Sequence, residues 1–223
     1  MIDKEKYKKI KKPWPTKKAM EQIYRENLWG ESTSKFYSGE GSHTLKQVMP
    51  YVHKVKAFLQ SFDSLFTVCD LGCGDFNIGK QLFPYTRQYI AVDIVNDLIE
   101  YNKQHFKVPH VDFLCLDIAK DNLPKADCVI LRQVLQHLSN KEIKAILEKL
   151  YAYKYIILTE HLPEGTFEPN KDIISGQGIR LKKKSGVAIL KEPFIFKAKK
   201  QTELLAIPNA TFGGVVVTWL LEL

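Results

Sequence analysis

The stretch from Val68 to Leu82, VCDLGCGDFNIGKQL, constrains this chain more than any other. An apolar run breaks at two glycines and resumes with the spacing of a helix, which predicts a strand, a tight turn and a helix. Gly72 and Gly74 would let the backbone approach a ligand closely, because they carry no Cβ. The helix would direct free N–H groups and a positive dipole end at an anionic group. Strands also end in glycine for purely structural reasons, so the turn alone does not establish a ligand site.

The rest of the chain alternates short apolar runs with amphipathic stretches, which is typical of a parallel α/β sheet. Strands are expected at 66–71, 88–94, 111–118, 126–134, 154–161, 202–208 and 213–223, and helices at 45–61, 78–85, 96–106 and 139–153. Asn96 or Asp97 is expected to cap the helix at 96–106, and Ser139 with Glu142 has the spacing of a capping box. Residues 162–200, broken by prolines and glycines, predict a long loop that could hold a short hairpin. The last two strands are joined so closely that they must be antiparallel.

Composition limits the class of protein. With 223 residues, 45% of them hydrophobic, the chain can bury a substantial core as one domain. No apolar segment follows the basic start and no apolar run could span a bilayer, so we expect a soluble cytoplasmic protein without a membrane partner. The cysteines, which are Cys69, Cys73, Cys115 and Cys128, form no C-x-x-C pairs, so no metal site is expected, and Cys73 in the turn is the one expected to be exposed.

The net charge of +8 comes mainly from lysines clustered at 4–18 and 182–200. Such runs are commonly solvated surface, but a basic field also attracts anionic small molecules or nucleic acid. All three interpretations stay open at this point.

Acidic residues lie at the predicted ends of the second and third strands, which follow the glycine turn in the sequence. Asp93 closes the second predicted strand, about twenty residues after the turn, where a carboxylate can accept both hydroxyls of a ribose. Asp117 closes the third strand, and Arg132 lies near the end of the fourth. Because the carboxyl ends of parallel strands share one edge of a sheet, Gly72 and these three residues should line one crevice.

With these motifs the chain resembles the class I S-adenosylmethionine (SAM)-dependent methyltransferases. VCDLGCGDF resembles their first motif, YIAVDI their acidic second-strand motif, FLCLDI the adenine-side motif and ADCVILRQVLQHLS the fourth-strand motif. Asn77 departs from the pattern, since a third glycine is common there. The resemblance implies SAM as the cofactor and a set of cofactor-binding residues: Trp29, Asp70, Gly72, Gly74, Asp93, Ile94, Asp117, Ile118, Arg132 and Gln133.

A narrower resemblance comes from LWGESTSKFYSGEGSHTL at 28–45, with NKDIISGQGIRL and EPFIF later in the chain. These elements are similar to those of small bacterial methyltransferases that modify capsules or surface polysaccharides. Within that group, the chain most resembles the methyltransferases of capsular O-methyl phosphoramidate formation. Gly39, Gly41 and Ser42 could form a lid over the cofactor, or only a flexible loop.

The fold expected from pattern and resemblance together is α/β: a Rossmann-like, seven-stranded, mostly parallel sheet with an antiparallel C-terminal hairpin and helices on both faces. One methyltransferase domain is expected to fill residues 1–223. Its parts would be an N-terminal helical or lid segment (1–62), a cofactor-binding core (63–160), substrate-side loops (161–200) and the C-terminal hairpin (201–223).

The acceptor is expected to be a small molecule, anionic or linked to a sugar or nucleotide and methylated on oxygen. A hydroxyl acceptor benefits from a base, for which His137 and His161 are candidates, with Tyr37 as a possible aromatic or hydroxyl contact. An anionic acceptor needs no base, and the same histidines would then orient charge. Residues expected to bind the substrate are Ser42, His43 and Arg180.

Two other classes of function remain open. A nicotinamide-dependent oxidoreductase could use the same crevice, although the terminal hairpin disfavours it. A basic module that binds RNA through its lysines is the other. DNA is disfavoured, because LRQVLQH stands where amino-directed DNA methyltransferases carry D-P-P-Y or N-P-P-Y. The oligomeric state is not predicted.

Overall fold

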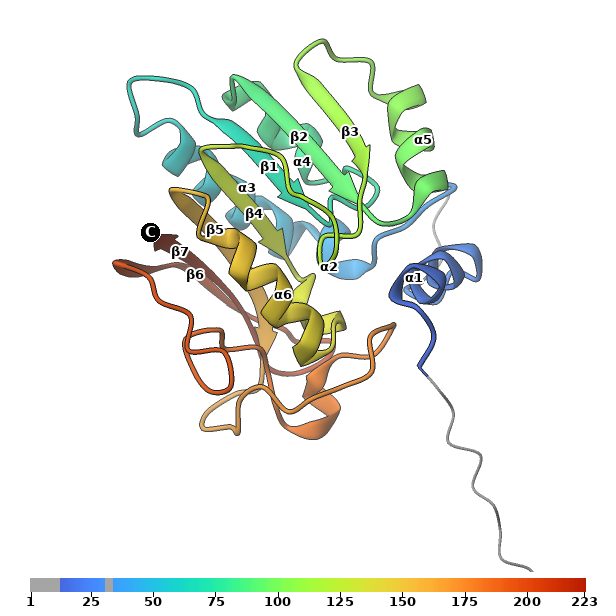
Figure 1. The fold of residues 1–223 in the computed structure, drawn as a ribbon, viewed down its shortest axis with the longest axis vertical. Helices are drawn as coiled ribbons and strands as arrows, with labels where there is room; N and C mark the ends of the chain where they lie inside the picture. The colour runs from blue at the N-terminus through green and yellow to red at the C-terminus, as the bar shows by residue number, and fades with distance from the viewer. Residues whose placement is uncertain (1–12, 31–33) are drawn as a thin grey trace, which may run out of the picture.

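The computed structural model describes residues 13–30 and 34–223. The beginning of the basic run at 4–18 lies outside these residues. Within them, seven strands form one sheet in the order β3-β2-β1-β4-β5-β7-β6 (Figure 1). Their bounds are β1 Thr67–Leu71, β2 Gln88–Asp93, β3 Val111–Cys115, β4 Cys128–Arg132, β5 Tyr155–Leu162, β6 Lys200–Pro208 and β7 Val215–Glu222.

The first five strands are parallel, and β7 lies antiparallel between β5 and β6. This arrangement confirms the predicted fold class, including the antiparallel pair at the C-terminus. The chain order reverses between β1 and β4, where the crossovers diverge and leave a crevice beyond the carboxyl ends of the strands.

Helices cover both faces of the sheet, as predicted (Figure 1). The helical segments are α1 Thr16–Arg25, α2 Glu40–His43, α3 Leu45–Leu59, α4 Gly79–Leu82, η1 Phe83–Tyr85, α5 Asn96–His105, η2 Leu135–His137, α6 Asn140–Leu150 and η3 Arg180–Lys183. α1 and α6 pack on one face, and α3 packs on the other. Strand residues alternate between the two hydrophobic clusters: Val68 contributes to the α3 side, and Cys69 to the α6 side.

Several local predictions need correction. The helix expected at 78–85 is one α-helical turn followed by a 3₁₀ turn, because Pro84 has no N–H to continue the helix. β3 ends at Cys115, since the chain turns where Asp117 Oδ1 accepts from the Ala119 amide at 3.1 Å. The segment at 162–200 contains η3 and no hairpin.

The two capping predictions had opposite outcomes. The N-cap of α5 is Val95, which makes no side-chain capping bond, so the predicted cap at Asn96 or Asp97 is wrong. Ser139 caps α6 in a complete capping box with Glu142, as predicted.

The expectation that Cys73 is exposed is wrong. Cys73 is 8% exposed, because its side chain packs into the core beneath the turn. No helix in the described part of the chain is long and apolar enough to cross a bilayer.

Candidate functional site

A cavity of about 490 Å³ lies at the carboxyl ends of β1, β2 and β4. Its wall includes the following residues that the sequence analysis singled out: Trp29, Ser42, Gly72, Gly74, Asp93, Ile94, Asp117, Ile118, Arg132, Gln133, His137 and His161. The structure thus brings together side chains separated by more than a hundred positions in the sequence. The expected crevice shared by the turn and the strand-end acids is present.

The glycine turn is held by its neighbours. Gly72 has φ +87° and Gly74 has φ +57°, both in the region that favours glycine. A Cβ on Gly72 would lie 2.4 Å from Val134 Cγ2, and a Cβ on Gly74 would lie 2.3 Å from Ser38 Oγ. The glycines are therefore required for packing against protein atoms, in addition to any approach of a ligand.

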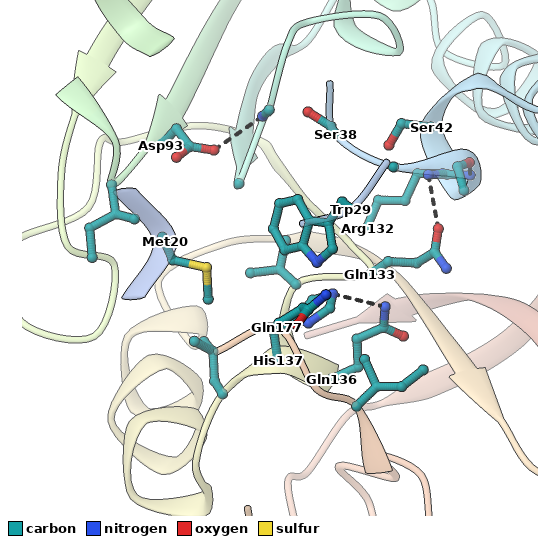
Figure 2. A pocket seen from close by; sticks show the side chains of 18 of the residues that line it. Met20, Trp29, Ser38, Ser42, Asp93, Arg132, Gln133, Gln136, His137 and Gln177 are labelled. Atoms are coloured by element: carbon teal, nitrogen blue, oxygen red, sulfur yellow. Dashed lines mark hydrogen bonds between the residues drawn. The ribbon is translucent and has the colours of Figure 1, made fainter. Parts of the chain in front are cut away.

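Asp93 is buried at the end of β2, with 8% of its surface exposed. Its Oδ2 accepts a hydrogen bond from the Gly74 amide at 3.1 Å (Figure 2). Its Oδ1 accepts one from the Val95 amide at 3.1 Å. Burial raises the pKa of Asp93, and the backbone donors oppose that shift. Each carboxylate oxygen keeps lone-pair capacity beyond its one amide, which suits a pair of hydroxyl donors.

Asp117 and Ile118 form the wall beyond β3, together with Leu116 and Ala119. The Asp117 carboxylate accepts from the Ala119 amide and forms an ion pair with Lys120 at 2.6 Å. This part of the cavity combines an apolar wall with one carboxylate.

Asp70 lies elsewhere. It is 4% exposed and does not line the cavity; Tyr89 donates its hydroxyl to Asp70 Oδ2 at 2.8 Å. The alternation along β1 directs Asp70 to the same face as Val68, into the core on the α3 side. Burial raises the pKa of this carboxyl to about 6. Asp70 was expected to bind the cofactor, but its carboxylate instead accepts a hydrogen bond within the core.

Residues 38–42, which we call the lid, lie against the glycine turn and the end of β4. Ser38 N donates to Asp75 Oδ2 at 3.0 Å, and Asp75 N donates to Ser38 Oγ at 2.8 Å. The Asn77 side-chain amide donates to Ser42 O at 2.6 Å, and Arg132 Nη2 donates to Gly41 O at 2.6 Å. Figure 2 shows Ser38 and Ser42 on the same side of the pocket as Arg132.

Tyr37 and His43 lie beside the lid, outside the cavity wall. Their rings are 4.5 Å apart between centroids, and His43 Nε2 lies 2.6 Å from Asp75 Oδ2. The expected roles of Tyr37 in catalysis and of His43 in substrate binding are thus not matched by their positions. His43 instead connects the lid region to Asp75, just after the glycine turn, and Tyr37 packs against the His43 ring.

His137 and His161 both reach the cavity. His137 lies in η2, where its Nδ1 is 3.2 Å from Gly176 O and its Nε2 is 3.3 Å from the side-chain nitrogen of Gln136. Burial lowers the pKa of His137 to about 4. His161 Nε2 lies 2.6 Å from Gly213 O, and burial lowers the pKa of this imidazole as well.

Arg180 is 1% exposed and does not line the cavity. Its guanidinium donates to Leu138 O at 2.8 Å and Asn140 Oδ1 at 2.7 Å, and also to the carbonyls of Leu135, Gln136 and Lys171. These acceptors occupy the donors that an anionic substrate would need. The expectation that Arg180 binds substrate is therefore not supported by its position. The Arg180 side chain instead attaches η3 to the segment that carries His137.

Sequence reasoning missed part of the wall. Met20 and Tyr24 of α1, Gln136 after β4, and Gln177 and Phe212 from two loops all line the cavity. The spacing of Met20, Ile23 and Tyr24 could have predicted α1 as an amphipathic helix. The loop residues carry no comparable periodic signal.

Comparisons with known proteins agree with this geometry. Residues 68–153 match the family described as "Methyltransferase domain". Acetylserotonin O-methyltransferase of Homo sapiens is 32% identical over 132 residues, which cover 54% of this chain and 38% of that protein. The protein of the same name from Macaca mulatta is 33% identical over 88 residues, which cover 38% of this chain and 26% of the other.

Among solved structures, the N-methyltransferase NodS from Bradyrhizobium japonicum WM9, in complex with S-adenosyl-L-homocysteine (SAH), has a TM-score of 0.65 at 12% identity. The alignment covers 92% of this chain and 98% of NodS. Human N-acetylserotonin methyltransferase in complex with SAM has a TM-score of 0.56 at 22% identity, covering 94% of this chain and 60% of that structure. At these identities the likeness shows the fold.

The chain spans less than half the length of the curated relatives it matches. Within that span the family match covers β1 to α6 and includes the glycine turn, Asp93, Asp117 and Arg132. The similarity to a methyltransferase domain thus lies in the segment that supplies these parts of the cavity wall.

Proposed function

We propose that this chain is a SAM-dependent methyltransferase that acts on a small-molecule acceptor. The observation that carries the proposal is the cavity where the glycine turn, Asp93 and Arg132 meet within the segment of the family match. The solved relatives described above were crystallised with SAM or SAH, and their fold is the fold of this chain.

The residues of the cavity suit the parts of SAM. The Asp93 carboxylate would accept the two ribose hydroxyls, and Ile94 and Ile118 would pack against adenine. Arg132 is 9% exposed and its Nε has no hydrogen-bond partner within the described residues, so a carboxylate of the ligand would satisfy a buried donor. When bound, SAM supplies a methyl group on a positively charged sulfur, which a nucleophile can attack.

The lid would exclude water from this region. Its hydrogen bonds to Asp75, Asn77 and Arg132 place residues 38–42 over the turn. Exclusion of water limits competing reactions and strengthens the electrostatic contacts made by the residues that remain.

Capsule or surface-polysaccharide modification stays a hypothesis about the acceptor, supported only by the sequence motifs at 28–45, 170–181 and 192–196. A nicotinamide-dependent oxidoreductase is the alternative for the same crevice. The terminal antiparallel strands and the family match favour the methyltransferase.

Calorimetric titration with SAH, and separately with NAD, tests the proposal. We expect SAH to bind the wild-type chain and NAD not to bind. Asp93→Ala should weaken SAH binding about a hundredfold, because it removes two charge-assisted hydrogen bonds together worth about 3 kcal/mol. His137→Ala should leave SAH affinity unchanged.

Asp112→Ala is a matched control, since Asp112 is an exposed carboxylate on the neighbouring strand β3. Circular dichroism melts of each variant would separate lost binding from lost folding. NAD binding without SAH binding would overturn the proposed function. Unchanged SAH affinity in a folded Asp93→Ala variant would place the ribose elsewhere.

A further inference from the structure

Large apolar side chains are exposed at the opening of the cavity. Leu28 and Phe212 belong to the cavity wall and are exposed to solvent. Trp14 and Ile174, like Phe212, keep more than half of their surface exposed. Single apolar side chains on a surface need no explanation, but several gathered at one opening indicate an interaction site. Contacts between the segments that carry these four residues show that they are gathered.

Glu142 joins the segments of Trp14 and Ile174. Its carboxylate, on the cavity wall, accepts hydrogen bonds from the hydroxyls of Thr16 and Ser175. Trp14 lies two residues before Thr16, and Ile174 directly precedes Ser175. Figure 1 shows the orange loop of residues 162–200 reaching toward the blue start of α1. The two apolar side chains therefore flank the same edge of the cavity.

Leu28 and Phe212 continue this edge. Gln177, three residues after Ile174, donates its side-chain amide to Leu28 O at 2.6 Å. Phe212 lies in the turn between β6 and β7, where its backbone N–H donates to Asn209 Oδ1 at 3.0 Å. Asn209 also lines the cavity. The four apolar side chains thus come from three segments that meet around one opening.

Lysines lie among these apolar side chains. Lys182, in η3, lines the cavity, and Lys183 and Lys184 follow it; all three are exposed. Lys17 and Lys18 are exposed at the start of α1. None of the five forms an ion pair with another described residue. Parts of the two lysine clusters at 4–18 and 182–200 thus bring positive charge to one opening.

The acidic residues of the same segments leave an excess of positive charge. α1 carries one acidic residue against three basic ones, and residues 172–184 carry one against four. The Glu142 carboxylate is occupied by hydroxyl donors, and Asp172 Oδ1 accepts from the backbone amides of Asn140 and Ile173 at 2.7 and 2.9 Å. The opening therefore combines apolar side chains with net positive charge.

A bilayer that contains anionic lipids matches this combination. Its headgroups attract lysines, and its hydrocarbon accepts apolar side chains that project between them. Tryptophan in particular favours the interface between lipid and water. RNA would also match the lysines, but Leu28 and Ile174 offer no flat face on which a base could stack. Arg180, the one arginine of residues 172–184, is buried away from the surface.

We propose that the rim of the cavity docks on the surface of a bilayer that contains anionic lipids. The rim consists of Trp14, Leu28, Ile174 and Phe212 with the lysines at 17–18 and 182–184. The docking is peripheral, since no helix in the described part of the chain could cross a bilayer. It revises the expectation that the chain has no membrane partner. The inference does not rest on the proposed function, although a docked chain would turn its cavity toward the lipid.

Sedimentation of the full chain with sucrose-loaded vesicles tests the surface. At about 0.1 M salt, we expect vesicles of equal parts phosphatidylglycerol and phosphatidylcholine to bind at least about twentyfold tighter than vesicles of phosphatidylcholine alone. Equal binding to both, or binding to neither, would overturn the proposal. So would equal affinity for dihexanoyl phosphatidylglycerol below its micellar concentration, because a single lipid offers a headgroup without a surface.

The double variant Lys18→Gln/Lys184→Gln removes one exposed charge from each lysine segment. We expect it to bind the mixed vesicles about twentyfold more weakly, since each lysine near an anionic surface contributes about fivefold. Lys46→Gln/Lys54→Gln is the matched control, because both lysines are exposed on α3, which packs on the other face of the sheet. Equal losses in the two double variants would assign vesicle binding to the net charge of the chain and overturn the rim.

The double variant Trp14→Ser/Ile174→Ser tests the apolar part of the rim. It should bind the mixed vesicles at least about tenfold more weakly, because two apolar side chains no longer enter the lipid. Leu45→Ser/Met49→Ser is the control, since it removes two exposed apolar side chains from α3. Circular dichroism melts would confirm that both variants fold. Undiminished binding by the folded rim variant would assign the attraction to charge elsewhere in the chain and contradict the docking.

Tryptophan emission reports contact with the hydrocarbon. Vesicles whose phosphatidylcholine chains carry bromine should quench the emission of the bound wild-type chain, and Trp14→Phe should lose most of this quenching. Quenching that is equal in the two proteins would show that the edge marked by Trp14 does not enter the lipid, against the proposal.

Anisotropy of a labelled single-stranded oligouridylate of about 20 nucleotides tests nucleic acid as the other partner of the lysines. We expect it to bind more weakly than the mixed vesicles at the same salt concentration. Tighter binding of the oligonucleotide, weakened in Lys18→Gln/Lys184→Gln and unchanged in Lys46→Gln/Lys54→Gln, would make the rim a nucleic-acid surface and overturn the proposal.

Discussion

Single residues in this chain are constrained by the atoms against them as much as by their own backbone angles. Gly72 illustrates this, because its positive φ and the contact with Val134 act together. The sequence predicts a turn at this position, but the neighbour comes from the segment after β4. Replacement of Gly72 therefore tests a tertiary contact and a backbone preference at once.

Gly72→Ala should lower the free energy of unfolding by roughly 3 kcal/mol or more, as the sum of backbone strain and overpacking. Gly165→Ala is the control, since Gly165 has φ +67° and a Cβ there would have no atom within 4 Å. That control should cost only about 1 kcal/mol. Denaturant unfolding measures both, and Gly72→Ala with Val134→Ala should recover part of the loss. Equal costs at the two glycines would show that the contact with Val134 is unimportant.

Asp70 makes stability depend on pH. Its pKa in the fold, about 6, lies above the ordinary value of 3.8, because burial disfavours the charged form. The folded chain thus holds this proton more tightly than the unfolded chain does. The stability that the group contributes is full below about pH 4 and is lost as the pH rises through about 6.

Asp70→Asn removes this titration and keeps an oxygen that can accept from Tyr89. Between pH 4 and pH 8, the stability of Asp70→Asn relative to wild type should increase by up to about 3 kcal/mol, because only wild type loses stability over this range. Tyr89→Phe, which removes the donor, should be destabilising and more so at pH 8. Chemical denaturation at the two pH values measures both variants. If the free energies of unfolding of Asp70→Asn and wild type differed by the same amount at pH 4 and pH 8, Asp70 would be excluded as the titrating group.

At the scale of elements, the lid is attached to the glycine turn by side chains that the sequence analysis did not assign to it. Asn77 departs from the common glycine of the resembled family, and the structure shows a use for its side chain, the hydrogen bond to Ser42 O. Asp75 binds both Ser38 and His43. The lid and turn therefore form one connected unit.

Asn77→Ala should increase the dissociation rate of SAH about fivefold, because the lid loses one hydrogen bond worth about 1 kcal/mol. Stopped-flow tryptophan fluorescence provides the measurement, since Trp29 lines the cavity. Gln81→Ala is the control, since it removes a similar side-chain bond, to Asn77 O at 2.9 Å, that does not involve the lid. The same dissociation rate in Asn77→Ala and wild type would contradict a closing role for residues 38–42.

The elements themselves were largely predictable, because their signals are local. The capping box at Ser139, the alternating strands and the terminal antiparallel pair all depend on residues near one another in the chain. The errors at 78–85 and at the end of β3 had local causes, whereas those at Asp70 and Arg180 arose where a distant contact decided the outcome. The loop at 162–200 has no periodicity, and Arg180 attaches it to the segment carrying His137 through carbonyls that no sequence pattern reveals.

At the scale of the whole molecule, the cavity is assembled from α1, the lid, the strand ends and two C-terminal loops. A ligand there would contact segments from both ends of the chain. Binding should therefore stabilise the entire fold and leave no part to melt separately.

SAH at a hundredfold its dissociation constant should contribute about 2.7 kcal/mol of stability and raise Tm by roughly 5–10 °C for a chain of this size. Differential scanning calorimetry measures the shift, with NAD at equal concentration as the control ligand. A shift with NAD and none with SAH would favour the oxidoreductase.

The sequence alone determined the order of the seven strands and of the helices between them, the glycine turn, and the position of Asp93 at the end of β2 with Asp117 shortly after β3. These features follow from hydrophobic periodicity and from backbone preferences that act over a few residues. Only the tertiary structure decided that Asp70 enters the core, that Arg180 is occupied, and that Trp29 lies against His137. The physical reason is that burial and hydrogen-bond partners are supplied by segments far away in the chain, so the charge of a side chain and the groups it can bind are settled only when the chain has folded.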